Sequence, residues 1–282
     1  MKTGLVLEGG GVRGIYTAGV LDVFMEHGIT FDGVIGVSAG AVHGCSYLSG
    51  QHGRSIRYYK KYSRDPRFMS IWSLLKTGNI VGVDFCYHEL PEKLDLYDNE
   101  AFLRCGVPFY AVCSNVETGE AEYLQVHDML KDIDVVRASA SMPFVSKVVE
   151  VNGKKYLDGG STDSIPVEAF MQMGYGRNVV VLTRDEAYRK KKELSFLSRV
   201  MYRKYPAFAK VQGKRHEVYN QTVERICDLE KEGSAFVIRP SRPLKIKRTE
   251  NRPEKIEEIY LIGRSDALAK IEDLKAWRAE NT

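Results

Sequence analysis

Short apolar runs alternate along this chain with longer stretches whose apolar residues recur at helical spacing. A short continuous apolar run bounded by polar or turn residues is typical of a strand buried on both faces of a parallel sheet. The runs of this kind are residues 4–8, 34–37, 109–113, 179–183 and 235–239. Between the first two, apolar side chains recur at every third position from Ile15 to Phe24, which predicts a helix ended by His27-Gly28.

The intervals between these strands are predicted to be mainly helical. Residues 39–48 carry many small side chains, as expected of a helix packed closely on a sheet, and residues 51–105 read as helical and irregular. Residues 184–225 are polar and poor in strand signals, so we expect a helical region to start there. Beyond Arg252 the chain is again helical, and Ser265-Asp266 is predicted to cap its last helix.

A β-hairpin is predicted where Asn152-Gly153 separates the short apolar segments 148–151 and 155–157. A type I′ turn needs positive φ at both central residues, and this dipeptide supplies them readily. Strands that alternate with helices predict an α/β fold, a three-layer α/β/α sandwich with a mainly parallel sheet. We expect the sandwich in residues 1–185 and a mostly helical C-terminal extension in 186–282, which either packs with it as one unit or stands apart.

Composition predicts a soluble cytoplasmic protein with reduced thiols. The apolar run at the start of the chain ends at Glu8, so it does not read as a signal peptide. No uninterrupted apolar stretch approaches the roughly 20 residues that span a bilayer. The five cysteines are odd in number and include no C-x-x-C pair, which argues against a disulfide framework. No cluster of His, Cys and Asp has metal-ligand spacing, so we expect neither metal nor cofactor.

Charge is distributed unevenly along the chain. The net charge of +4 combines −4 over residues 1–183 with +8 over residues 184–282. The basic region 189–215 interleaves lysines and arginines with aromatic residues. Such a region either contacts an anionic membrane, which would place the protein peripherally at the inner membrane surface, or forms a solvated helical face. We expect no nucleic-acid partner.

Two glycine-rich turns each follow an apolar run and precede a helix-like stretch. They are Glu8-Gly9-Gly10-Gly11-Val12-Arg13-Gly14 and Gly36-Val37-Ser38-Ala39-Gly40. The glycines of the first turn let backbone amides approach an anion. The second turn fits a nucleophile elbow, in which a strand end, a tight turn and a helix start expose a serine. The alternative for Ser38 is a helix N-cap hydroxyl.

A nucleophilic serine needs a base, and Asp158 is better placed for this role than any histidine. His216 is the one histidine beyond the plausible aspartates, as α/β-hydrolase order requires, but it lies in a polar stretch that reads as solvent-exposed. Asp158 follows a predicted strand and precedes Gly159-Gly160, which leave space around its carboxylate. Burial would raise its pKa and make it a stronger base. The alternative is a turn residue in an Asp-Gly loop.

Together these segments resemble the signature blocks of patatin-like phospholipases, with an extension like that of one bacterial branch. The sequence Ala-Ser-Ala-Ser-Met-Pro-Phe at 138–144 resembles a further block, and the resemblance covers residues 1–185 as the catalytic domain. It implies a Ser–Asp dyad in which Ser38 is the nucleophile and Asp158 the base. The implied oxyanion amides are those of Gly9, Gly10, Gly11 and Val12. The implied supporting residues are Gly14, Gly36, Gly40, Gly159, Gly160 and Arg13, which supports its loop or meets a lipid phosphate.

The resulting prediction is a serine acyl-ester hydrolase, similar to a phospholipase A, that acts on a lipid or fatty-acyl ester. An acyltransferase on the same dyad and a lipid-surface adaptor with little turnover are the alternatives. A dinucleotide-binding protein is disfavoured. Gly9-x-Gly11-x-x-Gly14 matches that fingerprint, but the fingerprint needs an acidic residue at the end of the second strand. Asp32 instead precedes the strand predicted at 34–37.

Overall fold

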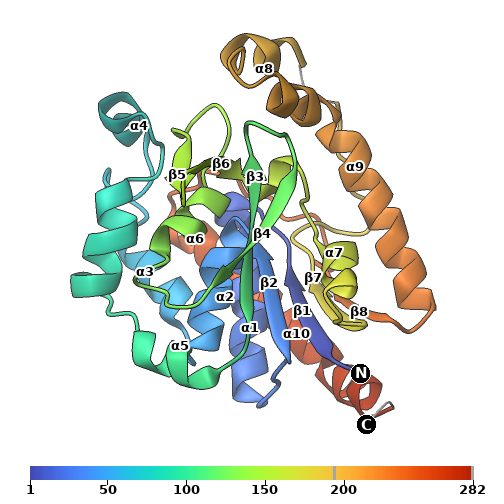
Figure 1. Ribbon diagram of the computed structural model, residues 1–282. Helices are drawn as coiled ribbons and strands as arrows, with labels where there is room; N and C mark the ends of the chain where they lie inside the picture. Colours follow the sequence, from blue (N-terminus) through green and yellow to red (C-terminus); the bar gives the residue numbers. More distant parts are fainter. Residues whose placement is uncertain (193–194, 281–282) are drawn as a thin grey trace.

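An eight-stranded sheet runs through the middle of the computed structural model, which describes residues 1–192 and 195–280 (Figure 1). Its strands are β1 (Thr3–Leu7), β2 (Gly33–Val37), β3 (Phe109–Asn115), β4 (Ala121–Val126), β5 (Val149–Val151), β6 (Lys154–Asp158), β7 (Arg177–Val181) and β8 (Ala235–Ile238). The strand order is β5-β6-β3-β2-β1-β7-β8, and β4 also pairs with β3. The pairs from β3 to β8 along this path are parallel, so the predicted mainly parallel sheet is confirmed.

Helices cover both faces of this sheet. They are α1 (Ile15–Glu26), α2 (Ala39–Leu48), α3 (Arg54–Tyr62), α4 (Ile71–Thr77), α5 (Asn99–Cys105), α6 (Ile133–Ser139), α7 (Val167–Gln172), α8 (Ser195–Met201), α9 (Pro206–Lys231) and α10 (Pro253–Ala279), with short helical segments η1 (Gly11–Gly14), η2 (Phe85–Leu94) and η3 (Gly159–Ser161). Leu5 and Leu7 of β1 pack with α1, α2 and α10, whereas Val6 packs with α7 and α9 on the opposite face. The predicted three-layer α/β/α sandwich is therefore confirmed.

The C-terminal part of the chain packs directly on this sandwich. β8 extends the sheet beside β7, and α10 lies against α1 with close backbone contact. An added Cβ at Gly263 would collide with the carbonyl oxygen of Tyr16. The mostly helical character expected for residues 186–282 is confirmed, while a domain boundary at residue 185 stays a prediction.

Two local predictions differ in outcome, and one strand was not predicted. The hairpin is confirmed, with φ of 50° at Asn152 and 76° at Gly153. The helix cap at Ser265-Asp266 is wrong, because α10 begins at Pro253 and passes through both residues, and the Asp266 carboxylate instead accepts a hydrogen bond from the Tyr16 hydroxyl. The strand β4 was not predicted, since its residues are half exposed and alternate without a continuous apolar run.

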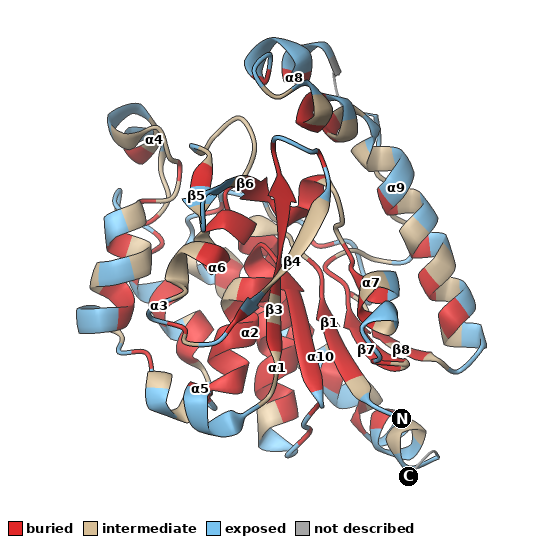
Figure 2. Cartoon of the chain, viewed as in Figure 1, coloured by how far each residue is buried: buried red, intermediate tan, exposed pale blue. Residues whose placement is uncertain are grey.

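Burial is concentrated in the sheet and on the inner faces of the helices, as Figure 2 shows. In the same view α4 and α8, which stand at the end of the molecule toward which β3 points, are largely exposed. No helix in the described ranges is both long enough and apolar enough to cross a membrane.

Candidate active site

Ser38 occupies a strained turn between β2 and α2. Its φ of 55° and ψ of −120° are unusual for a residue with a side chain and cost of order 1–3 kcal/mol, which the surrounding structure must sustain. The Ser38 amide donates to the Ser139 hydroxyl over 2.9 Å, which helps to hold the turn. Gly40 lets α2 approach β1 closely, because a Cβ there would collide with the Leu7 carbonyl oxygen. Gly36 similarly faces the backbone of α2.

Asp158 reaches Ser38 because two strands share one edge of β3. On β3, β4 occupies one edge over residues 109–114, so β2 and β6 both lie along the other edge. Val37 pairs with Val112 and Asp158 pairs with Cys113, so the carboxyl ends of β2 and β6 meet. Gly159 continues this close approach, since a Cβ there would collide with the carbonyl oxygen of Val112.

The carboxyl group of Asp158 is buried and has arginine side chains in its surroundings. Burial raises its pKa above the usual value for an aspartate. The opposing influences, largest first, are the positive charge of Arg215, a hydrogen bond with the Ser38 side chain, the Gly160 amide at 2.8 Å, and the positive charge of Arg248. A buried carboxylate beside a serine hydroxyl can accept its proton more readily than an exposed one.

The first glycine turn lies beside Ser38 and leaves several backbone amides without partners. No hydrogen bond to another residue in the described ranges involves the amides of Gly9, Gly10 or Gly11. Gly11 has a φ of 57°, which its missing Cβ permits. The Val12 amide differs, because it donates to the carbonyl oxygen of Arg248 over 3.1 Å and is therefore already occupied. The N-terminus of α2 adds a favourable field for negative charge at this point.

Arg13 is buried at the end of the glycine turn. Its side chain is 5% exposed, and its Nε donates to the Thr183 hydroxyl at 3.4 Å. Burial, and next the charge of Arg184, lower its pKa to about 10. Thr183 also donates to the Glu8 carboxylate, which ties the turn to the end of β7. Gly14 completes the support, because a Cβ at this position would collide with the side chain of Ala39.

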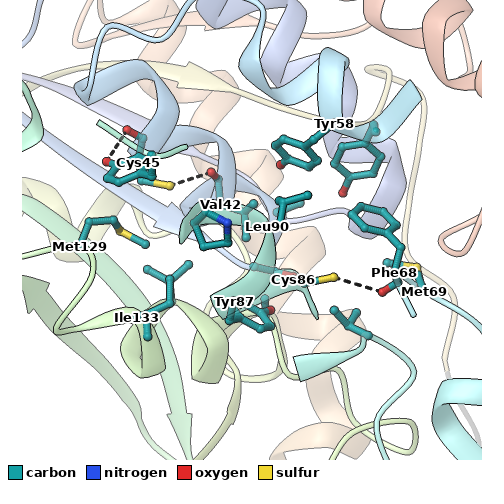
Figure 3. A pocket seen from close by; sticks show the side chains of 18 of the residues that line it. Val42, Cys45, Tyr58, Phe68, Met69, Cys86, Tyr87, Leu90, Met129 and Ile133 are labelled. Atoms are coloured by element: carbon teal, nitrogen blue, oxygen red, sulfur yellow. Dashed lines mark hydrogen bonds between the residues drawn. The ribbon is translucent and has the colours of Figure 1, made fainter. Parts of the chain in front are cut away.

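An apolar pocket opens on one side of Ser38 (Figure 3). Side chains of α2, α3, η2 and α6 line it, and those labelled in the figure are Val42, Cys45, Tyr58, Phe68, Met69, Cys86, Tyr87, Leu90, Met129 and Ile133. Apart from Arg54, which pairs with Asp95, no charged residue of the described part of the chain lines this pocket.

A second, polar pocket also opens at Ser38 and contains Asp158. Ser38, Gly11 and Met142 line both pockets, so Ser38 stands at their junction. The polar pocket also contains Arg184, Arg215 and Arg248, of which the sequence predictions named none as a site residue. These three come from the part of the chain that follows β7, and only its uneven charge pointed toward them.

No histidine from the described ranges lines either pocket. The His43 side chain is buried, with Nδ1 at 2.9 Å from the Ser55 hydroxyl, and burial lowers its pKa to about 3. His216 is partly buried rather than exposed as predicted, and it lies beside Glu217 on α9. Asp32 accepts a hydrogen bond from the Thr3 amide before β2 begins, which is the wrong end of the strand for a dinucleotide site.

The fold and the site define a class of protein, an α/β/α sandwich that presents a serine on a strained strand-to-helix turn beside a buried aspartate. The model of the family described as patatin-like phospholipase matches residues 5–171, which is more than half of the chain. The protein therefore belongs to the patatin-like phospholipase family, and the resemblance is confirmed. A second model, described as a domain of unknown function (DUF6363), matches residues 205–279.

Individual relatives align with about two thirds of this chain. Uncharacterized protein YjjU of Escherichia coli is 32% identical over 186 residues, which are 64% of this chain and 52% of that protein. Lysophospholipase NTE1 of Cryptococcus neoformans is 28% identical over 187 residues, which are 64% of this chain and 11% of that protein. The crystal structure of VipD from Legionella pneumophila has a TM-score of 0.47 and 14% identity, covering 96% of this chain and 67% of that chain. This chain thus spans about half the length of the first relative and a small part of the second.

Proposed function

We propose that the protein is a serine acyl-ester hydrolase that cleaves fatty-acyl esters of lipids, with Ser38 as nucleophile and Asp158 as base. Membership in the patatin-like phospholipase family and the likeness to Lysophospholipase NTE1 support lipid hydrolysis. The observation that carries the proposal is the position of Ser38 at the junction of an apolar and a polar pocket. A lipid ester has the same division, since its acyl chain lies on one side of the carbonyl carbon and its alcohol on the other.

In the proposed reaction the Ser38 Oγ attacks the ester carbonyl carbon while its proton passes to the Asp158 carboxylate. Negative charge develops on the carbonyl oxygen, where the amides of Gly9, Gly10 and Gly11 would donate hydrogen bonds. One such donor typically contributes about 2.7–4 kcal/mol of transition-state stabilisation. The Val12 amide is not among these proposed donors, because it already donates a hydrogen bond to the Arg248 carbonyl oxygen.

The tetrahedral intermediate then collapses, the bond from carbon to the alcohol oxygen breaks, and Asp158 returns its proton to the departing alkoxide. Water attacks the acyl group on Ser38 and gives a proton to Asp158, which returns it to the Ser38 oxygen as the fatty acid leaves. Each half-reaction therefore leaves the Ser–Asp pair in its starting protonation state.

The test compares ester hydrolysis by the wild type with that of Ser38→Ala and Asp158→Asn. Both substitutions should lower kcat by about a thousandfold or more on a soluble p-nitrophenyl ester and on a lysophospholipid. Ser46→Ala and Asp163→Asn are matched controls, because neither side chain lines a pocket at Ser38. Wild-type turnover in either dyad variant would contradict the proposed dyad.

Two alternatives are separated by their products and by labelling. An acyltransferase would pass the acyl group to an alcohol acceptor, so mass spectrometry of the products formed with an added acceptor measures its share. An adaptor with little turnover would not be labelled at Ser38 by a fluorophosphonate probe, whereas an active serine hydrolase would be.

We also propose that the protein docks peripherally on an anionic membrane through α4 and α8. Their exposed apolar side chains are Ile71, Trp72, Leu75, Phe196, Leu197, Val200 and Met201. Residues that follow each helix contact the loop that lines the polar pocket, because the Ile80 amide donates to the Val145 carbonyl oxygen and the Phe144 amide donates to the Tyr202 hydroxyl. Exposed basic residues of the region 189–215 flank α8 on both sides. Two residues of this region, Glu193 and Leu194, lie outside the described residues. Apolar and basic side chains together suit an anionic lipid surface.

A further inference from the structure

The polar pocket beside Asp158 carries more positive than negative charge. Its charged lining residues are Arg13, Arg184, Lys190, Arg215 and Arg248 against Glu8 and Asp158. The Glu8 carboxylate is already occupied, since it accepts hydrogen bonds from Thr183 and from the Tyr219 hydroxyl at 2.9 Å. No acidic side chain of the described ranges lies within ion-pair distance of Arg184 or Arg248. Arg184 and Arg248 therefore bring positive charge to the pocket that no acidic side chain of the described ranges pairs with.

Two buried polar atoms in the same pocket have no partner in the part of the chain that the structure describes. They are the Oε1 of Gln212, whose side chain is 3% exposed, and the Oγ of Ser161, which is 2% exposed. A buried polar atom without a hydrogen bond is costly, so native sites usually supply one. An acceptor such as the Gln212 Oε1 is suited to a hydroxyl group of a ligand.

Arg13 does not offer its charge to a ligand in the polar pocket. Its guanidinium is buried under the glycine turn and engaged with Thr183. Arg184 is half-buried and stacks on Tyr188 at 4.0 Å, and Arg248 is exposed at the pocket edge, so both keep donors available to a ligand. Arg215 donates to the Gly160 carbonyl oxygen and adds its charge beside Asp158. We call Arg184, Arg215 and Arg248 the cationic wall of the pocket, and all three follow β7 in the chain.

We propose that this polar pocket is a subsite for the phosphate group of a glycerophosphate headgroup, with Arg184 and Arg248 on the phosphate and Gln212 on a free glycerol hydroxyl. The inference rests on the proposed function, because it places the scissile ester at Ser38 and the acyl chain in the apolar pocket. Ser38 lines both pockets, so one monoacylated glycerophosphate reaches both at once. Phosphate oxygens match the donors of arginine well, whereas an uncharged monoacylglycerol would leave the cationic wall unmatched.

The experiment measures equilibrium binding by calorimetry to the full chain carrying Ser38→Ala, which prevents turnover. The probes are a lysophosphatidic acid and a monoacylglycerol with the same short acyl chain, both below their micellar concentrations, and inorganic phosphate. Arg184→Gln and Arg248→Gln are each added to this chain. Lys214→Gln is the matched control, because Lys214 is an exposed cation on α9 that does not line the pocket.

Each arginine variant should weaken the binding of lysophosphatidic acid relative to monoacylglycerol by about ten- to a hundredfold, and Lys214→Gln should not. An unchanged ratio in the arginine variants, or an equal fall in the control, would overturn the headgroup subsite. Phosphate binding that needs the arginines without any preference for lysophosphatidic acid would also overturn it, in favour of a free-phosphate site. Binding is measured without turnover, so a preference for lysophosphatidic acid that depends on the arginines supports the subsite whether or not the wild type hydrolyses esters. Absence of hydrolysis by the wild type would contradict only the proposed function.

Discussion

Val37 and Asp158 pair with consecutive residues of β3, although 120 positions separate them in the chain. β2 runs parallel to β3 and β6 runs antiparallel to it, so their carboxyl ends meet along one edge of β3. Ser38 and Asp158 are therefore held together by backbone hydrogen bonds of a sheet rather than by a flexible loop. Residues positioned by sheet strands are held more precisely than residues on loops.

The first prediction concerns pH dependence. In the proposed mechanism Asp158 must be ionised to accept a proton, so activity should be lost as pH falls through its pKa, which burial raises and Arg215 lowers. Arg215→Gln removes the lowering charge, so the acid limb of kcat/KM should move to higher pH. The measurement uses a short p-nitrophenyl ester, which has no phosphate. Lys214→Gln also removes one positive charge from α9, and a similar displacement in this control would count against a specific effect of Arg215.

The next prediction concerns the packing of α2 on β1. An added methyl group at Gly40 would collide with backbone atoms of Leu7, which cannot move aside as a side chain can. Gly40→Ala should therefore lower the free energy of unfolding by about 1–3 kcal/mol in urea titrations and reduce activity. Gly44→Ala is the matched control on the same helix, because its nearest neighbours are side-chain atoms of Leu7 and Phe109 at 3.1 and 3.2 Å. Equal destabilisation by both substitutions would contradict this explanation.

The sequence predicts most of the sandwich because its buried strands are continuous apolar runs and its hairpin turn is encoded by Asn152-Gly153. β4 is not predicted from the sequence, because its residues form no continuous apolar run and its pairing with β3 makes it a strand. Ser38 and Asp158 are recognisable from local motifs. Arg215 and Arg248 are not, because only the tertiary packing of the C-terminal part brings them to Asp158.

A third prediction concerns acyl-chain length. Val42 lies one turn beyond Ser38 on α2 and lines the apolar pocket near its junction with the polar one. Val42→Phe should fill this space and lower kcat/KM for a long-chain p-nitrophenyl ester about tenfold or more relative to the butyrate, since each excluded methylene is worth about 1–3 kcal/mol. Val218→Phe on the exposed face of α9 is the control. A parallel loss for both ester lengths would argue against the apolar pocket as the acyl site.

The last prediction concerns the membrane surface. The Phe196 side chain is 75% exposed on α8 and that of Ile71 is 72% exposed on α4, so both can insert into the headgroup region of a bilayer. The protein should sediment with vesicles containing phosphatidylglycerol more than with pure phosphatidylcholine vesicles, and added salt should weaken this binding by screening the basic residues. Phe196→Ser and Ile71→Ser should each reduce binding about tenfold, because burial of a large apolar side chain contributes about 1.5–3 kcal/mol.

Leu261→Ser is the matched control for this surface, because Leu261 is 54% exposed on α10 and belongs to neither α4 nor α8. It should leave vesicle binding unchanged. Binding that ignores salt and lipid charge would remove the role of the basic region, whereas binding that survives both α4 and α8 substitutions would place the membrane contact elsewhere. Thermal unfolding of each variant separates loss of binding from loss of fold, since exposed substitutions usually change stability by less than about 0.5 kcal/mol.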